Sequence, residues 1–358
     1  MTSQEPVLTA LHRAVPDRVP VNYHANPGID SRLKAHFGLA REDAEGLRCA
    51  LGVDFRGVYP PYRGPRLHAD DLARGVVANE WGIRRRWIEH SSGGYWDFCD
   101  FPLRDADEDT IARWPLPSPD DYDYEAVRGA ARRHAESRFA VYLGGAGVCD
   151  IINGNGMLRG MEQTLVDLAG DDPAGLLLAR RRVEIQLEIL RRSLEAASEW
   201  IDFLWIGEDL GTQIGPLISL ELYRRALRPL HRQFVDLARS HGLPVMVHTC
   251  GSSSWVYEDF IEMGIAAVDT LQPEARNMSP EYLKQKFGGR LAFHGCISTA
   301  GPVERGTVAE TVAYGRRTLE IMMPGGGYCF APTHELQDDS PTENVVAMYE
   351  TARRWGAY

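Results

Sequence analysis

The stretch Leu243-Pro244-Val245-Met246-Val247-His248-Thr249-Cys250-Gly251 places an imidazole and a thiol at the end of a short apolar run. An uninterrupted run of this kind, rich in branched residues, is typical of a strand buried on both faces of a parallel sheet. Successive side chains of a strand point to opposite faces, so His248 and Cys250 point the same way. Together they could supply two ligands to a soft metal ion.

A third candidate ligand lies far downstream. Cys329 follows the glycine turn Gly325-Gly326-Gly327 in a second apolar segment. One histidine and two cysteines with an open fourth position form the ligand set of a catalytic zinc. The residues therefore predict a Zn²⁺ site made of His248, Cys250 and Cys329.

Similar apolar runs alternate with helical patterns along the chain. The other runs are 19–24, 139–144, 203–207, 267–271, 291–295 and 328–330. Residues 176–200 have helical periodicity after an Asp172-Pro173 start, and Thr307 begins a further helix with capping-box spacing. Alternating strands and helices leave a closed (β/α)8 barrel or an open doubly wound sheet. The number of strands favours the α/β class with a (β/α)8 TIM barrel.

Residues 51–124 differ in composition, because they are dense in Trp, Tyr, Pro and Arg. We interpret them as an aromatic-rich insertion after the first strand that holds a small antiparallel element. It would serve as a lid or as a dimer surface. No linker demands a boundary, so residues 1–358 are predicted to form a single domain.

Composition narrows the classes of partner. The 358 residues are 44% hydrophobic and 25% charged, and the net charge of −11 is spread along the chain. Nucleic acid and membrane are therefore not expected partners. The N-terminus lacks a signal-peptide pattern and no apolar run could span a bilayer, which predicts a cytoplasmic protein. Six scattered cysteines then fit reduced thiols better than disulfides.

Active sites of barrels form from the loops at the carboxyl ends of the strands. The polar residues and thiols expected at this rim, besides the three proposed ligands, are Glu208, Asp209, Gln272, His294, Cys296, His334 and Glu335. Each has a structural alternative: a histidine or carboxylate can satisfy loop hydrogen bonds, and a lone cysteine is more often a small buried hydrophobe. We assign the structural role to Cys296, and to Cys49, Cys99 and Cys149.

From about Gly160 to the end, the chain resembles the uroporphyrinogen decarboxylase-like superfamily, specifically its cobalamin-linked methyltransferase branch. The segments that carry the resemblance are 208–213, 219–223, 248–251, 260–265, 293–299 and 341–345. The N-terminal third matches only through Asp17-Arg18-Val19-Pro20-Val21. The resemblance implies a TIM barrel and, in the methyltransferase branch, zinc ligands at His248, Cys250 and Cys329.

The resemblance also separates two activities. Decarboxylases of the superfamily carry an arginine-rich segment soon after the first strand, whereas residues 22–28 contain no arginine. The resemblance therefore favours a zinc-dependent methyltransferase that moves a methyl group between a corrinoid and a thiol or folate-type acceptor. No Asp-x-His-x-x-Gly stretch is present, so a corrinoid protein would be the partner that brings the cobalamin, unless the corrinoid is used free. A decarboxylase and a catalytically silent corrinoid-protein-binding member remain the alternatives.

Roles for the rim residues follow from that reading. Glu208 is expected to be a fourth zinc ligand or a base, with Asp209 and His334 as the other catalytic candidates. Gln272 and His294 are expected to contact the corrinoid. The methyl acceptor or donor would be a small molecule, and a homodimer would use the aromatic insertion.

Overall fold

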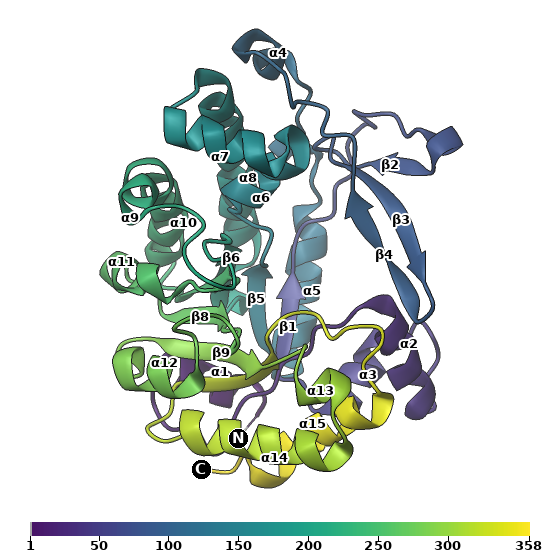
Figure 1. The fold of residues 1–358 in the computed structure, drawn as a ribbon, viewed down its shortest axis with the longest axis vertical. Helices are drawn as coiled ribbons and strands as arrows, with labels where there is room; N and C mark the ends of the chain where they lie inside the picture. The colour runs from purple at the N-terminus through teal and green to yellow at the C-terminus, as the bar shows by residue number, and fades with distance from the viewer. Residues whose placement is uncertain (1) are drawn as a thin grey trace.

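The computed structural model describes residues 2–358, and its main feature is one curled sheet of seven parallel strands surrounded by helices (Figure 1). The strand order is β1-β5-β6-β7-β8-β9-β10. The strands are β1 Phe55–Val58, β5 Ala140–Gly144, β6 Phe203–Gly207, β7 Val245–Thr249, β8 Ala267–Thr270, β9 Ala292–Ile297 and β10 Tyr328–Pro332. The predicted runs from residue 139 onward are thus confirmed as strands, within a few residues at their ends.

Residues 20–22 join the two edges of this sheet. The Phe330 amide of β10 donates to the Pro20 carbonyl (2.7 Å), and the Asn22 amide donates to the Phe330 carbonyl (3.0 Å). On the other side, the Asp54 amide next to β1 donates to the Val21 carbonyl (2.9 Å). The predicted strand 19–24 is therefore reduced to a single bridge, Val21 to Phe330, that links β10 to β1. This linkage is consistent with a TIM-like barrel.

The helices cover the outside of the sheet. They are α1 Gln4–Leu11, α2 Pro27–His36, α3 Ala44–Leu51, α4 Glu108–Arg113, α5 Tyr124–Glu136, α6 Ile151–Arg159, α7 Met161–Gly170, α8 Pro173–Ala197, α9 Leu220–Leu222, α10 Arg228–Ser240, α11 Tyr257–Met263, α12 Pro280–Phe287, α13 Pro302–Arg305, α14 Val308–Met322 and α15 Thr342–Trp355. The predicted starts are confirmed where the chemistry is strong: Asp172 caps α8, and Thr307 with Glu310 forms a capping box on α14.

The interior of the curled sheet is apolar near the amino ends of its strands. One buried cluster combines side chains from all seven strands of this sheet, such as Phe55 of β1 and Met246 of β7, with Val7 and Leu11 of α1. Helix α1 therefore closes the amino ends of the strands, and the carboxyl ends are left for the site.

Residues between β1 and α5 carry a separate antiparallel sheet of three strands, β2 Val76–Ala78, β3 Arg84–His90 and β4 Gly93–Phe98 (Figure 1). The antiparallel element expected from the sequence is thus present. The predicted insertion began too early, because β1 lies inside its range and pairs with β5 in the main sheet. Phe55-Arg56-Gly57-Val58 lacks the continuous apolar character of the other strands, which concealed it.

Hydrogen bonds to one buried side chain connect the antiparallel sheet to the barrel. The buried Asp338 carboxylate, beyond β10, accepts hydrogen bonds from the amides of Gly28 (2.7 Å), Ile29 (3.0 Å) and Gly94 (3.2 Å). One side chain thereby fastens the β3–β4 turn to the start of α2. Within residues 2–358, no helix combines the length and the apolar character that crossing a bilayer requires.

Candidate functional site

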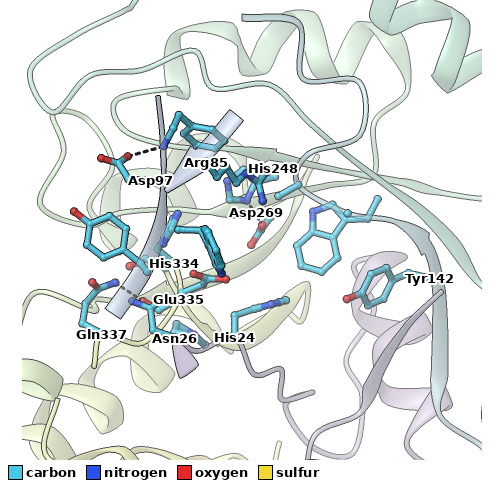
Figure 2. A pocket seen from close by; sticks show the side chains of 18 residues that line it. His24, Asn26, Arg85, Asp97, Tyr142, His248, Asp269, His334, Glu335 and Gln337 are labelled. Carbon is cyan, nitrogen blue, oxygen red and sulfur yellow. Dashed lines mark hydrogen bonds and ion pairs between the residues drawn. The ribbon is translucent and has the colours of Figure 1, made fainter. Parts of the chain in front are cut away.

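A cavity of about 710 Å³ opens at the carboxyl ends of the strands (Figure 2). Its walls come from four parts of the chain. These are the strand ends around Trp205, His248 and Asp269, the loop after β10 with His334, the antiparallel sheet with Arg85, and the segment before α2 with His24. This size is in the range of small-molecule sites. The antiparallel sheet therefore contributes to the cavity wall, whether or not it also acts as a lid.

One group of potential metal ligands lies beside this cavity. A ligand atom each from Asp209, His248 and Cys250 lies within 4.8 Å of the other two. Cys250 Sγ is 3.3 Å from His248 Nε2, and Asp209 Oδ1 is 3.8 Å from the same nitrogen. An imidazole, a thiol and a carboxylate are all zinc ligands in proteins, so the donor set fits that ion.

The loops after β6 and β7 hold these side chains together. Asp209 Oδ1 accepts a hydrogen bond from the Cys250 amide (2.8 Å), which links the two loops directly. The loops touch so closely at Gly251 that a Cβ there would lie 2.4 Å from the Gly211 carbonyl oxygen. Gly251 also has φ +68°, a conformation that favours glycine. The glycine after Cys250 is therefore required for the approach of the two loops.

Asp269 orients His248 from β8. Its Oδ2 accepts from His248 Nδ1 (2.6 Å) and its Oδ1 from His294 Nδ1 (2.5 Å). Burial raises the pKa of Asp269, but the two histidines outweigh that effect and hold the pKa well below its usual range. Burial also lowers the pKa of His248, while the hydrogen bonds to Asp269 and Cys250 raise it well above the ordinary value. His248 Nε2 thus favours a positive charge, which a proton or a metal ion can supply.

The polar chain continues past His294. The Asn22 amide nitrogen lies 3.0 Å from His294 Nε2 and 3.2 Å from His24 Nε2. An amide N–H₂ can only donate, so both Nε2 atoms accept and both rings carry their proton on Nδ1. A continuous line of hydrogen bonds therefore runs from His248 through Asp269 to His24.

Glu208 lies outside the metal-ligand group. Its oxygens accept from the Ile151 amide (3.0 Å) and the Ile152 amide (2.9 Å) at the start of α6, and one of them forms a hydrogen bond with His231 Nε2 (3.0 Å). Burial raises the pKa of Glu208 to about 8, against the effect of these amides. The predicted role of Glu208 as a zinc ligand thus has no support in the geometry, because the amino end of α6 and His231 occupy the carboxylate. Asp209 holds the place beside His248 instead.

Cys329 is also absent from the group. It is the second residue of β10 and is 1% exposed among apolar side chains of the barrel interior, including Phe55 and Met246. Two strands, β8 and β9, separate β10 from β7. Cys296 is likewise fully buried in the core, as its structural assignment expected.

The other predicted rim residues divide into two sets. His334 and Glu335 line the cavity, and the His334 ring centroid is 6.4 Å from that of His248. His294 lies behind Asp269 and does not line the cavity, and Gln272 accepts a hydrogen bond from the Gly251 amide (2.7 Å). The geometry gives both Gln272 and His294 a positioning role, and their contact with a corrinoid stays a prediction.

Several site residues were not singled out from the sequence. In the sequence, Asp269 is an acidic residue inside an apolar run. A charged residue in a run that is expected to be buried is the signal that could have identified it. Asn22 and His24 lie in the short first run, and Trp205 lies inside β6. Arg85 comes from the antiparallel sheet, and nothing in its local sequence relates it to the barrel rim.

The comparisons with known proteins agree with this architecture. The family model for Uroporphyrinogen decarboxylase (URO-D) matches residues 152–355, more than half of the chain. The chain therefore belongs to the uroporphyrinogen decarboxylase (URO-D) family. None of the curated proteins matches the sequence.

Two solved structures show where the fold has been seen. A methyltransferase from Methanosarcina mazei superposes with a TM-score of 0.64 at 18% identity, and the match covers 100% of both chains. That similarity extends the fold over the whole chain, including residues before 152. A D-psicose 3-epimerase has a TM-score of 0.34 at 12% identity over 66% of this chain and 82% of the other, which is too low to support an argument.

Proposed function

We propose that this protein is a zinc-dependent methyltransferase that moves a methyl group between a corrinoid and a thiol or folate-type acceptor. The observation that carries the proposal is the cluster of Asp209, His248 and Cys250 beside a cavity of about 710 Å³, in a chain of the URO-D family. The proposed ligands are these three residues. Asp209 thus replaces the Cys329 expected from the sequence.

The donor set suits the proposed chemistry. When bound, zinc lowers the pKa of a coordinated thiol, so that an acceptor sulfur is nucleophilic at neutral pH. Three protein ligands leave a position for that sulfur. Nitrogen, sulfur and oxygen donors within 4.8 Å of one another are consistent with this arrangement.

The chain's own residues would position the reactants. Asp269 holds His248 with Nε2 towards the cluster, and Asp209 holds the Cys250 amide. The aromatic side chains Tyr95, Trp96 and Phe98 of β4 line the cavity mouth and would exclude water from the bound acceptor. The corrinoid would come from a partner protein, and the small-molecule substrate would occupy the cavity.

Metal analysis tests the ligand set first. We expect about one zinc per chain in protein purified without chelator, and a loss of that zinc in Cys250→Ser and Asp209→Asn. Cys296→Ser is the matched control, because it changes a buried thiol outside the cluster. Full zinc retention in both cluster variants would refute the assignment.

The reaction is tested by visible absorbance, which changes when methylcobalamin loses its methyl group. We expect zinc-replete protein to demethylate methylcobalamin in the presence of a suitable thiol or of tetrahydrofolate. No demethylation, together with loss of carbon dioxide from a porphyrinogen, would indicate a decarboxylase. If neither reaction occurs and His248→Ala binds a corrinoid protein as well as the wild type does, a silent binding protein is indicated.

A further inference from the structure

Two residues that line the cavity have ring N–H donors without a hydrogen-bond partner among residues 2–358. Trp205 is 2% exposed and lines the cavity, and its Nε1 is buried without a hydrogen-bond partner among the described residues. An unpaired buried N–H costs about 1–3 kcal/mol, so native proteins seldom leave one without a reason. Trp205 pairs with Met246, two residues before His248 on β7, so it lies deeper in the barrel than the metal-ligand cluster.

His24 supplies a second donor beside it. The ring centroids of His24 and Trp205 are 5.4 Å apart, and His24 lines the cavity (Figure 2). Asn22 donates to His24 Nε2, which leaves the ring proton on Nδ1, and Nδ1 has no partner in residues 2–358. Burial lowers the pKa of His24 to about 4, so the ring is neutral near pH 7 and keeps that single N–H.

We propose that the small-molecule substrate of this cavity carries a carboxylate or carbonyl oxygen that accepts hydrogen bonds from Trp205 Nε1 and His24 Nδ1, below the Asp209–His248–Cys250 cluster. Because it names the substrate of the proposed active site, this inference rests on the proposed function. The two donors are present whatever the reaction, however, so their ligand can be tested without it.

The residues around these two donors restrict the chemical class of the ligand further. The Tyr142 ring centroid is 4.9 Å from that of Trp205, so the donors lie among aromatic faces that suit a flat ligand. Arg85 also lines the cavity, its Nε is buried without a partner, and it forms no ion pair within the described part of the chain. A ligand that offers oxygen acceptors, and preferably a negative charge, would satisfy these groups. A ligand that offers only donors would leave them unpaired.

Binding of three ring probes to metal-free protein tests the proposal by calorimetry. Benzoate and benzamide carry the oxygen acceptor, and toluene has the ring without it. We expect saturable binding of benzoate or benzamide and at least tenfold weaker binding of toluene. Tighter binding of benzoate than of benzamide would assign the acceptor to a carboxylate, and the reverse would assign it to a neutral carbonyl. Removing the metal prevents the carboxylate from binding zinc instead.

Variants then locate the acceptor. Trp205→Phe keeps an aromatic ring and deletes the N–H, so we expect roughly tenfold weaker binding of the preferred probe. Trp255→Phe is the matched control, because Trp255 Nε1 is also buried without a partner but lines a different cavity. His24→Leu should weaken binding similarly and carries the test if Trp205→Phe does not fold, as judged by its circular dichroism and unfolding midpoint.

The proposal would be overturned by no binding of either oxygen-bearing probe at millimolar concentration, by equal affinities for toluene and the preferred probe, or by unchanged affinity in the folded variants of Trp205 and His24. An equal loss in Trp255→Phe would also contradict it. None of these measurements uses zinc or a corrinoid. The probe-binding result can therefore be interpreted even if methyl transfer fails, and methyl transfer can be assessed even if the probes do not bind.

Discussion

Replacing Asp269 by asparagine should weaken zinc binding although Asp269 is not a proposed ligand. The carboxylate accepts one hydrogen bond from His248 (2.6 Å) and one from His294 (2.5 Å). Asparagine has nearly the same shape but only one acceptor oxygen, and its amide group would face the other ring N–H. One histidine must then carry its proton on Nε2, and in His248 that proton would compete with the metal ion.

The size of the effect follows from the bond that is lost. A hydrogen bond to a charged group contributes about 1.5–3 kcal/mol, and 1.4 kcal/mol corresponds to a tenfold change in an equilibrium constant. The loss of one such bond predicts a decrease in zinc affinity of about 10- to 100-fold, in line with other residues that hydrogen-bond to a ligating histidine.

A competition titration against a zinc-binding dye measures this affinity directly. Asp259→Asn is the matched control, because Asp259 is 1% exposed but pairs with Arg224 and Arg228 away from the cluster. A zinc affinity of Asp269→Asn within twofold of the wild type would refute the reasoning. An equal loss in Asp259→Asn would show that the effect is a general loss of stability.

Three further outcomes follow from the geometry. Cys329→Ser should retain the zinc that Cys250→Ser loses, as measured by metal analysis, and its loss in Cys329→Ser would restore the ligand set expected from the sequence. Asp338→Ala removes the acceptor of three backbone amides, so the free energy of unfolding in urea should fall by about 2–4 kcal/mol. An unchanged value would mean that the antiparallel sheet is held by other contacts. His24→Leu tests a pH dependence in metal-free protein: because burial lowers the pKa of His24 to about 4, the unfolded chain binds a proton first as the pH falls. The wild type should therefore lose roughly 2–3 kcal/mol more stability than His24→Leu between pH 7 and 4.5, and parallel pH profiles of the two would contradict this.

Much of the fold could be predicted because its signals are local. The strands from β5 to β10 appear as short apolar runs, and a run buried on both faces needs no information from distant parts of the chain. The starts of α8 and α14 were equally visible, since Asp172 and Thr307 cap nearby backbone amides. Strand β1 was missed because Arg56 and Gly57 interrupt its apolar character. The buried Arg56 guanidinium pairs with Glu45 of α3, a contact between separate elements, and it also donates to the Val53 and Phe55 carbonyls.

The same distinction between local and long-range information applies to the site. The spacing of His248, near the end of β7, and Cys250, directly after β7, indicated by itself that a nitrogen and a sulfur lie on the same side at the carboxyl end of the strand, because side chains alternate along a strand. Which third residue joins them depends on how neighbouring strands are staggered and how their loops fold. Tertiary structure therefore decided that Asp209 lies beside Cys250 while Cys329 stays in the apolar interior. It also placed Asp269, Asn22 and His24 in one line of hydrogen bonds, since that line crosses from β8 through β9 to the segment before α2, and no pattern within a single segment can specify such contacts.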